Sequence, residues 1–248
     1  MCTNPIVINR RFGTKTRQDL VPCGKCHECL LQKQSQFAAL SAIQAQNSDS
    51  VYFLTLTYDN VHVPLASKWI HGRFPVVYKA HLPMDKALIE TLSKNKNDSV
   101  LVDEHFYTLS LCRKDLQCVL KRFREYGRKH DWDLSKWSYS FFGEYGEHTA
   151  RPHYHGEMYN LSSEQIAKFV SLWEFGFTDC KLIPVYNNDG SHARVAVSLY
   201  VSKYIGKDKY THSFVRDGFV ELPRRVSSLH FGTNIDVERY RNFISARI

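Results

Sequence analysis

Apolar and polar residues alternate in four stretches of the chain, and this pattern predicts β-strands. The clearest stretch, residues 51–60, has one apolar face and one mixed face and ends in an Asp-Asn turn signal. Its expected buried residues are Tyr52, Leu54, Leu56 and Tyr58. The other predicted strands span residues 136–146, 152–160 and 176–186, and the turn-like EHTAR separates the first two of these.

Apolar residues recur with helical spacing in residues 22–46, 111–130, 162–175 and 193–207. In the second of these helices the predicted inward positions are Leu116, Val119, Leu120 and Phe123, opposite a basic outer face. The third helix should begin at a Ser cap, and the fourth should end at Gly206. The fourth stretch is rich in β-branched residues, so a strand also fits it.

Residues 61–107 lack a clear period and contain three prolines and the polar run SKNKNDS, which predicts a long surface insertion that is functional or partly disordered. Strands and helices do not alternate regularly, so the expected fold is α+β, a central antiparallel sheet with packed helices. We expect a Cys-rich segment and helix in residues 1–50 and a core in 51–210 that carries the insertion. The tail, 211–248, should pack on the core and hold a short helix near 235–246.

Charge favours a polyanionic partner. The chain has 248 residues and a formal net charge of +8, and its basic residues are interleaved with aromatic ones in 121–132 and 200–210. Such stretches suit phosphates and unstacked bases together, although many basic domains bind no nucleic acid. No run of about twenty apolar residues occurs, and the N-terminal apolar run is too short for a secretory signal. We therefore expect a soluble, cytoplasmic protein that does not engage a membrane.

Two histidines lie one residue apart in the predicted strand 152–160. Because side chains alternate across a strand, His153, His155 and Glu157 should share one face. The hairpin turn should bring Glu144 of the preceding strand back towards His153. A His, His, Glu set with open positions suits Mg²⁺ or Mn²⁺ in phosphoryl chemistry. Taken alone, the two histidines fit a solvated strand face as well as a metal site.

Two tyrosines flank a lysine in YVSKY, residues 200–204. At about 100° per residue, Tyr200, Lys203, Tyr204 and Lys207 form one stripe of the helix, and Val197, Val201 and Ile205 can anchor it to the sheet. One interpretation is an amphipathic helix with half-exposed tyrosines and solvated lysines. The other is a pair of phenolic nucleophiles with a cation that stabilises developing phosphate charge.

Together these segments resemble a known family. The order FLTLTY, GEYG with PHYHGEMY, and then YVSKY is similar to the three motifs of the HUH endonucleases. The two tyrosines around the lysine, with the N-terminal PCGKCHEC, make the chain most similar to replication initiators of microviruses, especially the short gokushovirus-type proteins. The resemblance covers residues 22–60 and 137–207, and it implies a HUH endonuclease-like fold of the ferredoxin or RRM type.

The resemblance implies a chemistry residue by residue. A metal, Mg²⁺ or Mn²⁺, would be held by Glu144, His153 and His155; Glu147, in the connecting turn, fits the family pattern less well. Tyr200 or Tyr204 would attack a phosphate of single-stranded origin DNA, leaving a 5′-phosphotyrosine and a free 3′-hydroxyl that a polymerase can extend. A later transesterification would rejoin the strand. Lys203 would be the stabilising cation, and Lys207 a weaker candidate that contacts only the DNA backbone.

The resemblance also implies a setting. The protein would start rolling-circle replication of a small phage genome in the host bacterial cytoplasm. The chain contains no G-x-x-x-x-G-K-[ST] phosphate loop, so unwinding would fall to a host helicase, and extension to a host polymerase. The alternatives are a plasmid initiator or relaxase of the same superfamily, a non-enzymatic module that binds single-stranded nucleic acid, and a basic scaffold protein.

Two further groups of residues have open roles. The basic face of the helix at 111–130 could guide single-stranded DNA or simply be solvated; its residues are Arg122, Arg124, Arg128 and Lys129. The odd total of seven cysteines, with no export signal, favours reduced thiols or a metal site. Cys23, Cys26 and Cys29 fit a structural zinc site with a fourth ligand from Cys2, His27 or elsewhere, or else reduced cysteines that cap a helix. Core positions are expected for Cys112, Cys118 and Cys180.

Overall fold

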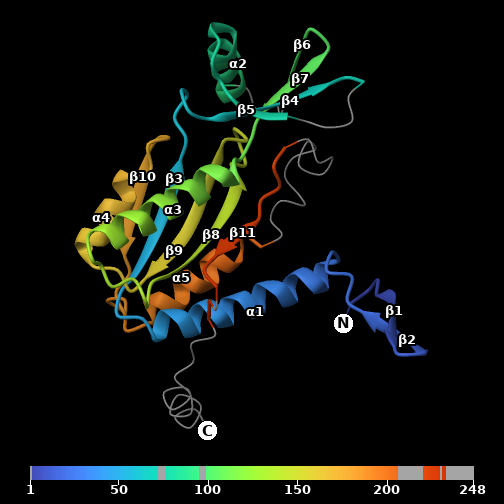
Figure 1. The fold of residues 1–248 in the computed structure, drawn as a ribbon, viewed down its shortest axis with the longest axis vertical. Coiled ribbons are helices and arrows are strands. Elements are labelled where there is room, and N and C mark those ends of the chain that lie inside the picture. The colour runs from blue at the N-terminus through green and yellow to red at the C-terminus, as the bar shows by residue number, and fades with distance from the viewer. Residues whose placement is uncertain (1, 72–75, 95–98, 206–219, 230, 233–248) are drawn as a thin grey trace.

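The fold is α+β, as predicted. The computed structural model describes residues 2–71, 76–94, 99–205, 220–229 and 231–232. Within these ranges it has five α-helices and three antiparallel sheets (Figure 1). The predicted helix near 235–246, Gly206 and Lys207 lie outside the described residues.

The central sheet has five strands in the order β10-β3-β9-β8-β11. Their bounds are β3 Val51–Thr57, β8 Ser138–Tyr145, β9 Pro152–Tyr159, β10 Thr178–Leu182 and β11 Arg225–Ser227. The first four are the strands predicted from alternation. The short edge strand β11 was not predicted, because three residues are too few to show a period. β9 lies in the middle of the sheet, between β3 and β8.

Helices cover both faces of this sheet (Figure 1). The helices α3, Arg113–Lys129, and α4, Ser163–Ser171, pack on one face, and α1, His27–Gln46, and α5, Ala193–Ser202, pack on the other. The residues predicted to face inward from β3 and α3 are all buried: Tyr52, Leu54, Leu56, Tyr58, Leu116, Val119, Leu120 and Phe123. The stretch that also fitted a strand is the helix α5.

Local details support these elements. Ser162 caps α4 in a reciprocal capping box with Gln165, which gives two backbone N–H groups at the helix start a side-chain partner each. In β9, a Cβ on Gly156 would lie 2.1 Å from a ring carbon of Phe141 in the neighbouring strand. Only glycine therefore fits directly after the two histidines.

The insertion at 61–107 is folded where the structure describes it, contrary to the expectation of a loop. It contains β4 Pro64–Trp69, β5 Val76–Lys79, α2 Pro83–Lys94, β6 Val100–Val102 and β7 His105–Leu109. Its strands form a sheet in the order β5-β4-β7-β6. Pro64 and Pro83 suggested a loop, yet each is the first residue of its element, where a missing N–H costs little. The strands were too short for their period to show.

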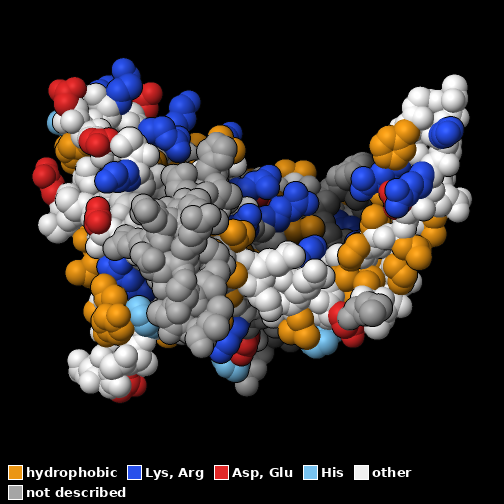
Figure 2. Space-filling model, turned by 90° about the horizontal axis from the view of Figure 1, so that it is seen from below, with side chains coloured by type: hydrophobic (Ala, Val, Ile, Leu, Met, Phe, Trp, Pro, Cys, Tyr) orange, Lys and Arg blue, Asp and Glu red, His pale blue; other side chains and the backbone are white. Residues whose placement is uncertain are grey.

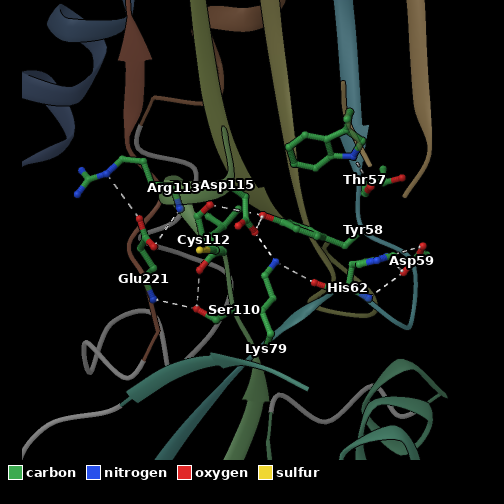
Figure 3. Close-up of polar contacts among 12 residues, drawn as sticks. Thr57, Tyr58, Asp59, His62, Lys79, Ser110, Cys112, Arg113, Asp115 and Glu221 are labelled. Atoms are coloured by element: carbon green, nitrogen blue, oxygen red, sulfur yellow. Dashed lines mark hydrogen bonds and ion pairs between the residues drawn. The ribbon is translucent and has the colours of Figure 1, made fainter. Parts of the chain in front are cut away.

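A polar network joins the insertion to the core (Figure 3). Lys79 at the end of β5 makes an ion pair with Asp115 of α3, and the hydroxyl of Tyr58 donates to the same carboxylate at 3.0 Å. The Lys79 ammonium also donates to the backbone carbonyl of His62 at 3.1 Å. These side chains are mostly shielded from solvent, so the contacts fix how the insertion sits on the sheet.

The N-terminal segment contains a hairpin that was not predicted. Its strands, β1 Ile6–Phe12 and β2 Lys15–Val21, pair along their full length and project from the end of α1 (Figure 1). Most of their side chains are exposed on both faces. A strand that buries neither face has no reason to alternate apolar and polar residues, so this segment carries no periodic signal.

Candidate metal centre and tyrosine pair

Glu144, His153 and His155 come together on one face of the central sheet. Glu144 of β8 is directly opposite His153 of β9, and His155 lies two residues further on the same face. One carboxylate oxygen of Glu144 lies 3.2 Å from Nε2 of His153 and 3.3 Å from Nε2 of His155. The three potential ligand atoms are all within 4.8 Å of one another.

Each histidine is oriented through its other ring nitrogen. Nδ1 of His153 lies 3.0 Å from the carbonyl oxygen of Arg151, which requires that Nδ1 carry the proton. Nδ1 of His155 lies 3.0 Å from the hydroxyl of Thr55 in β3. Both Nε2 atoms are thereby turned towards Glu144. Backing of this kind fixes the tautomer and ring position of a metal-binding histidine.

This set fits a divalent ion with open coordination positions. Two imidazoles and one carboxylate supply three ligands from adjacent strands, and side-chain exposures of 18% for His153 and 13% for His155 leave an approach from solvent. A mixed nitrogen and oxygen set suits Mn²⁺, Mg²⁺ or a similar cation. Glu147, the weaker candidate, is exposed in the turn between β8 and β9.

The two tyrosines of α5 and the turn after it adjoin this cluster. The ring of Tyr204 stacks on that of His155, with centroids 4.6 Å apart, and its hydroxyl donates to the hydroxyl of Tyr200 at 2.7 Å. Tyr204 is buried, whereas Tyr200 is 48% exposed. Burial raises the pKa of Tyr204 well above its usual value, and the hydrogen bond to Tyr200 and the nearby charge of Glu144 raise it further.

The predicted cation has a less defined position. Lys203 is exposed and caps α5, one residue before Tyr204. The backbone N–H groups of Lys203, Tyr204 and Ile205 each donate to a carbonyl three residues earlier, so the last turn is wound as a 3₁₀-helix. Val201 is buried and Val197 and Ile205 are partly buried against the sheet, as the anchoring role requires.

A buried polar cluster holds α5 in place, and sequence reasoning missed it. Ser41 of α1 donates to the carboxylate of Glu157 at 2.8 Å and lies 2.9 Å from the hydroxyl of Ser198. Glu157, on the histidine face of β9, is fully buried, which raises the pKa of its carboxyl to about 7. Arg194, at the start of α5, donates to the carbonyls of Ala45 and Ser48 at 3.0 and 2.6 Å. Polar residues inside an otherwise apolar helix were the available signal.

A cavity of about 480 Å³ opens beside Tyr204. It lies between α1, β8 and β11, and its lining combines two aromatic rings with three cations, namely Phe37, Phe142, Lys33, Arg224 and Arg225. The rings of Phe37 and Phe142 meet edge to face at 4.9 Å. The cations were missed because they come from two segments far apart in the chain.

The basic residues of α3 are not near the tyrosines. They belong to a helix on the opposite face of the sheet. Arg122 makes an ion pair with Glu174 at 2.9 Å, Arg128 with Glu125 at 3.2 Å, and Arg124 lies over the ring of Trp137. Lys129 is exposed in the last turn. A role of this face in guiding DNA stays a prediction, and it would act at a distance from the histidines.

Four cysteines form a second group of potential metal ligands. Cys2 joins the predicted Cys23, Cys26 and Cys29, and their sulfur atoms lie within 4.8 Å of one another. Of the three cysteines expected in the core, Cys112 and Cys180 are half-buried, and that expectation was wrong for Cys118, which is exposed on α3.

Comparison with known proteins points in one direction. Residues 88–209 match the model of a family of replication-associated proteins, described under the name ORF2. The match runs from α2 to beyond Tyr204 and so includes both the histidine strand and the tyrosines. No curated protein and no solved structure matches the chain. The similarity supports initiation of rolling-circle replication, with DNA as the substrate. Among the described residues no helix is both long and apolar enough to cross a membrane.

Proposed function

We propose that this protein is a metal-dependent endonuclease and strand transferase that nicks single-stranded origin DNA and starts rolling-circle replication. The observation that carries the proposal is the contact between a tyrosine and a metal-ligand set: the ring of Tyr204 stacks on His155, and its hydroxyl bonds to that of Tyr200. The family match over residues 88–209 supports it.

Glu144, His153 and His155 would hold Mn²⁺ or Mg²⁺. The ion would supply a Lewis acid that polarises the scissile phosphate. The protein's own part is to keep the three ligand atoms in one place. Glu144 and His153 are fixed by direct strand pairing, and the carbonyl of Arg151 and the hydroxyl of Thr55 orient the two imidazoles.

The nucleophile is a phenol of the tyrosine pair. Its oxygen forms a bond to the phosphorus, the bond from phosphorus to the 3′-oxygen breaks, and the products are a 5′-phosphotyrosine and a 3′-hydroxyl. Because Tyr204 is protonated at neutral pH, its proton must leave during attack, and the hydroxyl of Tyr200 at 2.7 Å is the first acceptor. Exposed Tyr200 can pass a proton to solvent. Reversal by a new 3′-hydroxyl rejoins the strand, so no ATP is consumed.

Two phenols at one site suit a replication cycle. While one tyrosine holds the 5′ end of the parent strand, the second can cleave the regenerated origin, and the released 3′-hydroxyl then closes the circle. Lys203, exposed beside the pair, would neutralise phosphate charge. The adjoining cavity would take a flanking nucleotide, with its base on Phe37 or Phe142 and its phosphate near Arg224 or Arg225.

The biological setting in this proposal is a small phage of the microvirus type, replicating in bacterial cytoplasm with the host's helicase and polymerase. The N-terminal PCGKCHEC and the paired tyrosines are the residues that support it. A plasmid initiator or relaxase would use the same chemistry.

The test is incubation with single-stranded DNA that contains the origin, with Mn²⁺, followed by a denaturing gel. We expect a protein-linked DNA fragment that EDTA prevents. His155→Ala should abolish the adduct, whereas His148→Ala, in the exposed turn before β9, should not. Tyr200→Phe combined with Tyr204→Phe should abolish it as well, and Tyr186→Phe, which is exposed outside the site, is the matched control. An adduct that survives the double change contradicts the nucleophile assignment. DNA binding without cleavage under any metal would favour a binding module instead.

A further inference from the structure

The four-cysteine cluster lies where the N-terminal hairpin meets α1. Cys2 precedes β1, Cys23 follows β2, Cys26 is the N-cap of α1, and Cys29 is in its first turn. Segments about twenty residues apart thus supply four sulfur atoms to one point. The group shares no residue with the site of Glu144, His153 and His155.

The sulfur spacing distinguishes among the states of such a cluster. The sulfurs of Cys23 and Cys29 are 3.9 Å apart, and those of Cys2 and Cys26 are 3.8 Å apart. A disulfide needs about 2.05 Å between sulfurs. Four thiolates at about 2.3 Å from a central zinc ion occupy the corners of a tetrahedron whose edges are about 3.8 Å. The observed distances match the tetrahedron and exclude a disulfide.

The backbone around the cluster favours thiolates. The N–H groups of Lys25 and Cys26 point at the sulfur of Cys23, at 3.4 and 3.3 Å, and the N–H of Cys23 points at that of Cys2, at 3.3 Å. Gly24 makes this turn possible, because its φ of +69° is a left-handed conformation that other residues rarely adopt. Donors aimed at sulfur stabilise negative charge there.

We propose that Cys2, Cys23, Cys26 and Cys29 bind a structural Zn²⁺ ion. Four protein thiolates fill the coordination shell, which is typical of a structural and not a catalytic zinc site. The fourth ligand is Cys2, and not His27, which is exposed beside the cluster. The ion would staple the hairpin to α1. A two-stranded hairpin without a buried face is marginally stable by itself, so this staple gives it a fixed position.

Zinc content tests the proposal without DNA or nicking, so it can fail independently of the proposed function. The full chain carrying His153→Ala and His155→Ala removes the other metal-ligand set, and mass spectrometry should still find one zinc per chain. Adding Cys2→Ser should lower this to near zero, whereas adding Cys118→Ser should not. Replacement of zinc by Co²⁺ should give thiolate-to-cobalt charge-transfer absorption and tetrahedral d–d bands, a readout that needs no cysteine variant. One zinc retained after Cys2→Ser, or none in the parent, overturns the site.

One face of the hairpin carries a separate inference, which rests on the proposed function. Strand pairing places Arg10 opposite Arg17 and Phe12 opposite Lys15 on that face. The single Asp19 pairs with both arginines, so three cations leave this face with a net charge of +2, and Phe12 is 62% exposed. Figure 2 shows Lys and Arg side chains along the hairpin and in the hollow between it and the rest of the molecule.

We infer that this face binds single-stranded DNA. Charge complementarity supplies the attraction to phosphates, and an exposed aromatic ring among cations suits an unstacked base. Anisotropy of a labelled single-stranded oligonucleotide tests it. The triple change Arg10→Ala, Lys15→Ala and Arg17→Ala should weaken binding at least about tenfold and flatten its salt dependence. The matched control removes as much charge from α3, as Arg124→Ala, Arg128→Ala and Lys129→Ala. Equal weakening by both triples, or none by the first, contradicts the inference.

Discussion

The two clusters of potential metal ligands differ in how they are built. Glu144, His153 and His155 project from paired strands in the middle of a sheet, with nitrogen and oxygen atoms and room for substrate. The four cysteines come from the N-terminal segment, a turn and a helix start, and they enclose their centre with sulfur alone. Proximity of ligands is common to both. The ligand chemistry and the number of open positions separate a site suited to reaction from one suited to folding.

The clusters also differ in what holds them before a metal binds. Strand hydrogen bonds, Thr55 and the carbonyl of Arg151 position the histidine cluster. The cysteine cluster joins a hairpin that has no core of its own to the end of α1. A metal therefore occupies a preformed site in the first case and creates order in the second.

The largest expected effect is a crossover between the two regions. His155→Ala should lower the nicking rate by about 1000-fold, since a Lewis acid supplies several kcal/mol, and leave the thermal transition and zinc content nearly unchanged. Cys26→Ser should lower the zinc content and the thermal transition of the N-terminal segment. Nicking of short DNA should then fall much less. Nicking rates, calorimetry and metal analysis of both variants check this. Equal loss of nicking would mean that the two regions are not separate.

The central sheet and its histidine face could be predicted because burial leaves a period in the sequence. β3 buries one face, so its alternation was visible, and the shared face of His153 and His155 followed from strand geometry. The hairpin β1–β2 buries neither face, and the strands of the insertion are too short, so neither left a pattern. Contacts between distant segments, such as Cys2 with Cys26, have no local signature.

A second way to separate the regions is pH. Burial raises the pKa of Glu157 to about 7, above its value in an unfolded chain. The folded state therefore keeps the proton between roughly pH 4.5 and 7 when the unfolded state has lost it, and stability falls as pH rises through this window. The full effect is about 3 kcal/mol at most. Glu157→Gln should flatten the dependence, as measured by urea unfolding across the window. Acid should have the opposite effect on the cysteine cluster, because protonated thiols release a metal.

A third, smaller effect concerns the orientation of one ligand. Thr55→Val removes the hydroxyl partner of Nδ1 of His155 while keeping the shape of the side chain. We expect the Mn²⁺ concentration for half-maximal nicking to rise about 10- to 100-fold, with most of the rate restored at saturating metal. Thr57→Val, on the same face of β3 but bonded to the carbonyl of Phe177, is the control. A similar shift in both variants would point to general loosening of β3.

The smallest effect should come from the contact that docks the insertion. Lys79→Met breaks the ion pair with Asp115, which keeps its hydrogen bond from Tyr58 (Figure 3). The cost should be about 1–2 kcal/mol, because the carboxylate is mostly buried. Zinc content and nicking per folded molecule should not change. Denaturant unfolding with Lys68→Met as the control measures the cost, and a loss of nicking would extend the functional region into the insertion.

The way α5 is fixed has a mechanical consequence. Arg194 holds its first turn to the carbonyls at the end of α1, and Ser198 holds its middle to Ser41. Only the 3₁₀ turn that carries Tyr204 lies beyond these two supports. The helix is then a beam clamped over most of its length with a short free end, and any stroke that advances a phenol towards a phosphate is confined to that end. Such a beam cannot swing widely, so the two tyrosines would exchange places by turning over a few ångströms rather than by moving the helix.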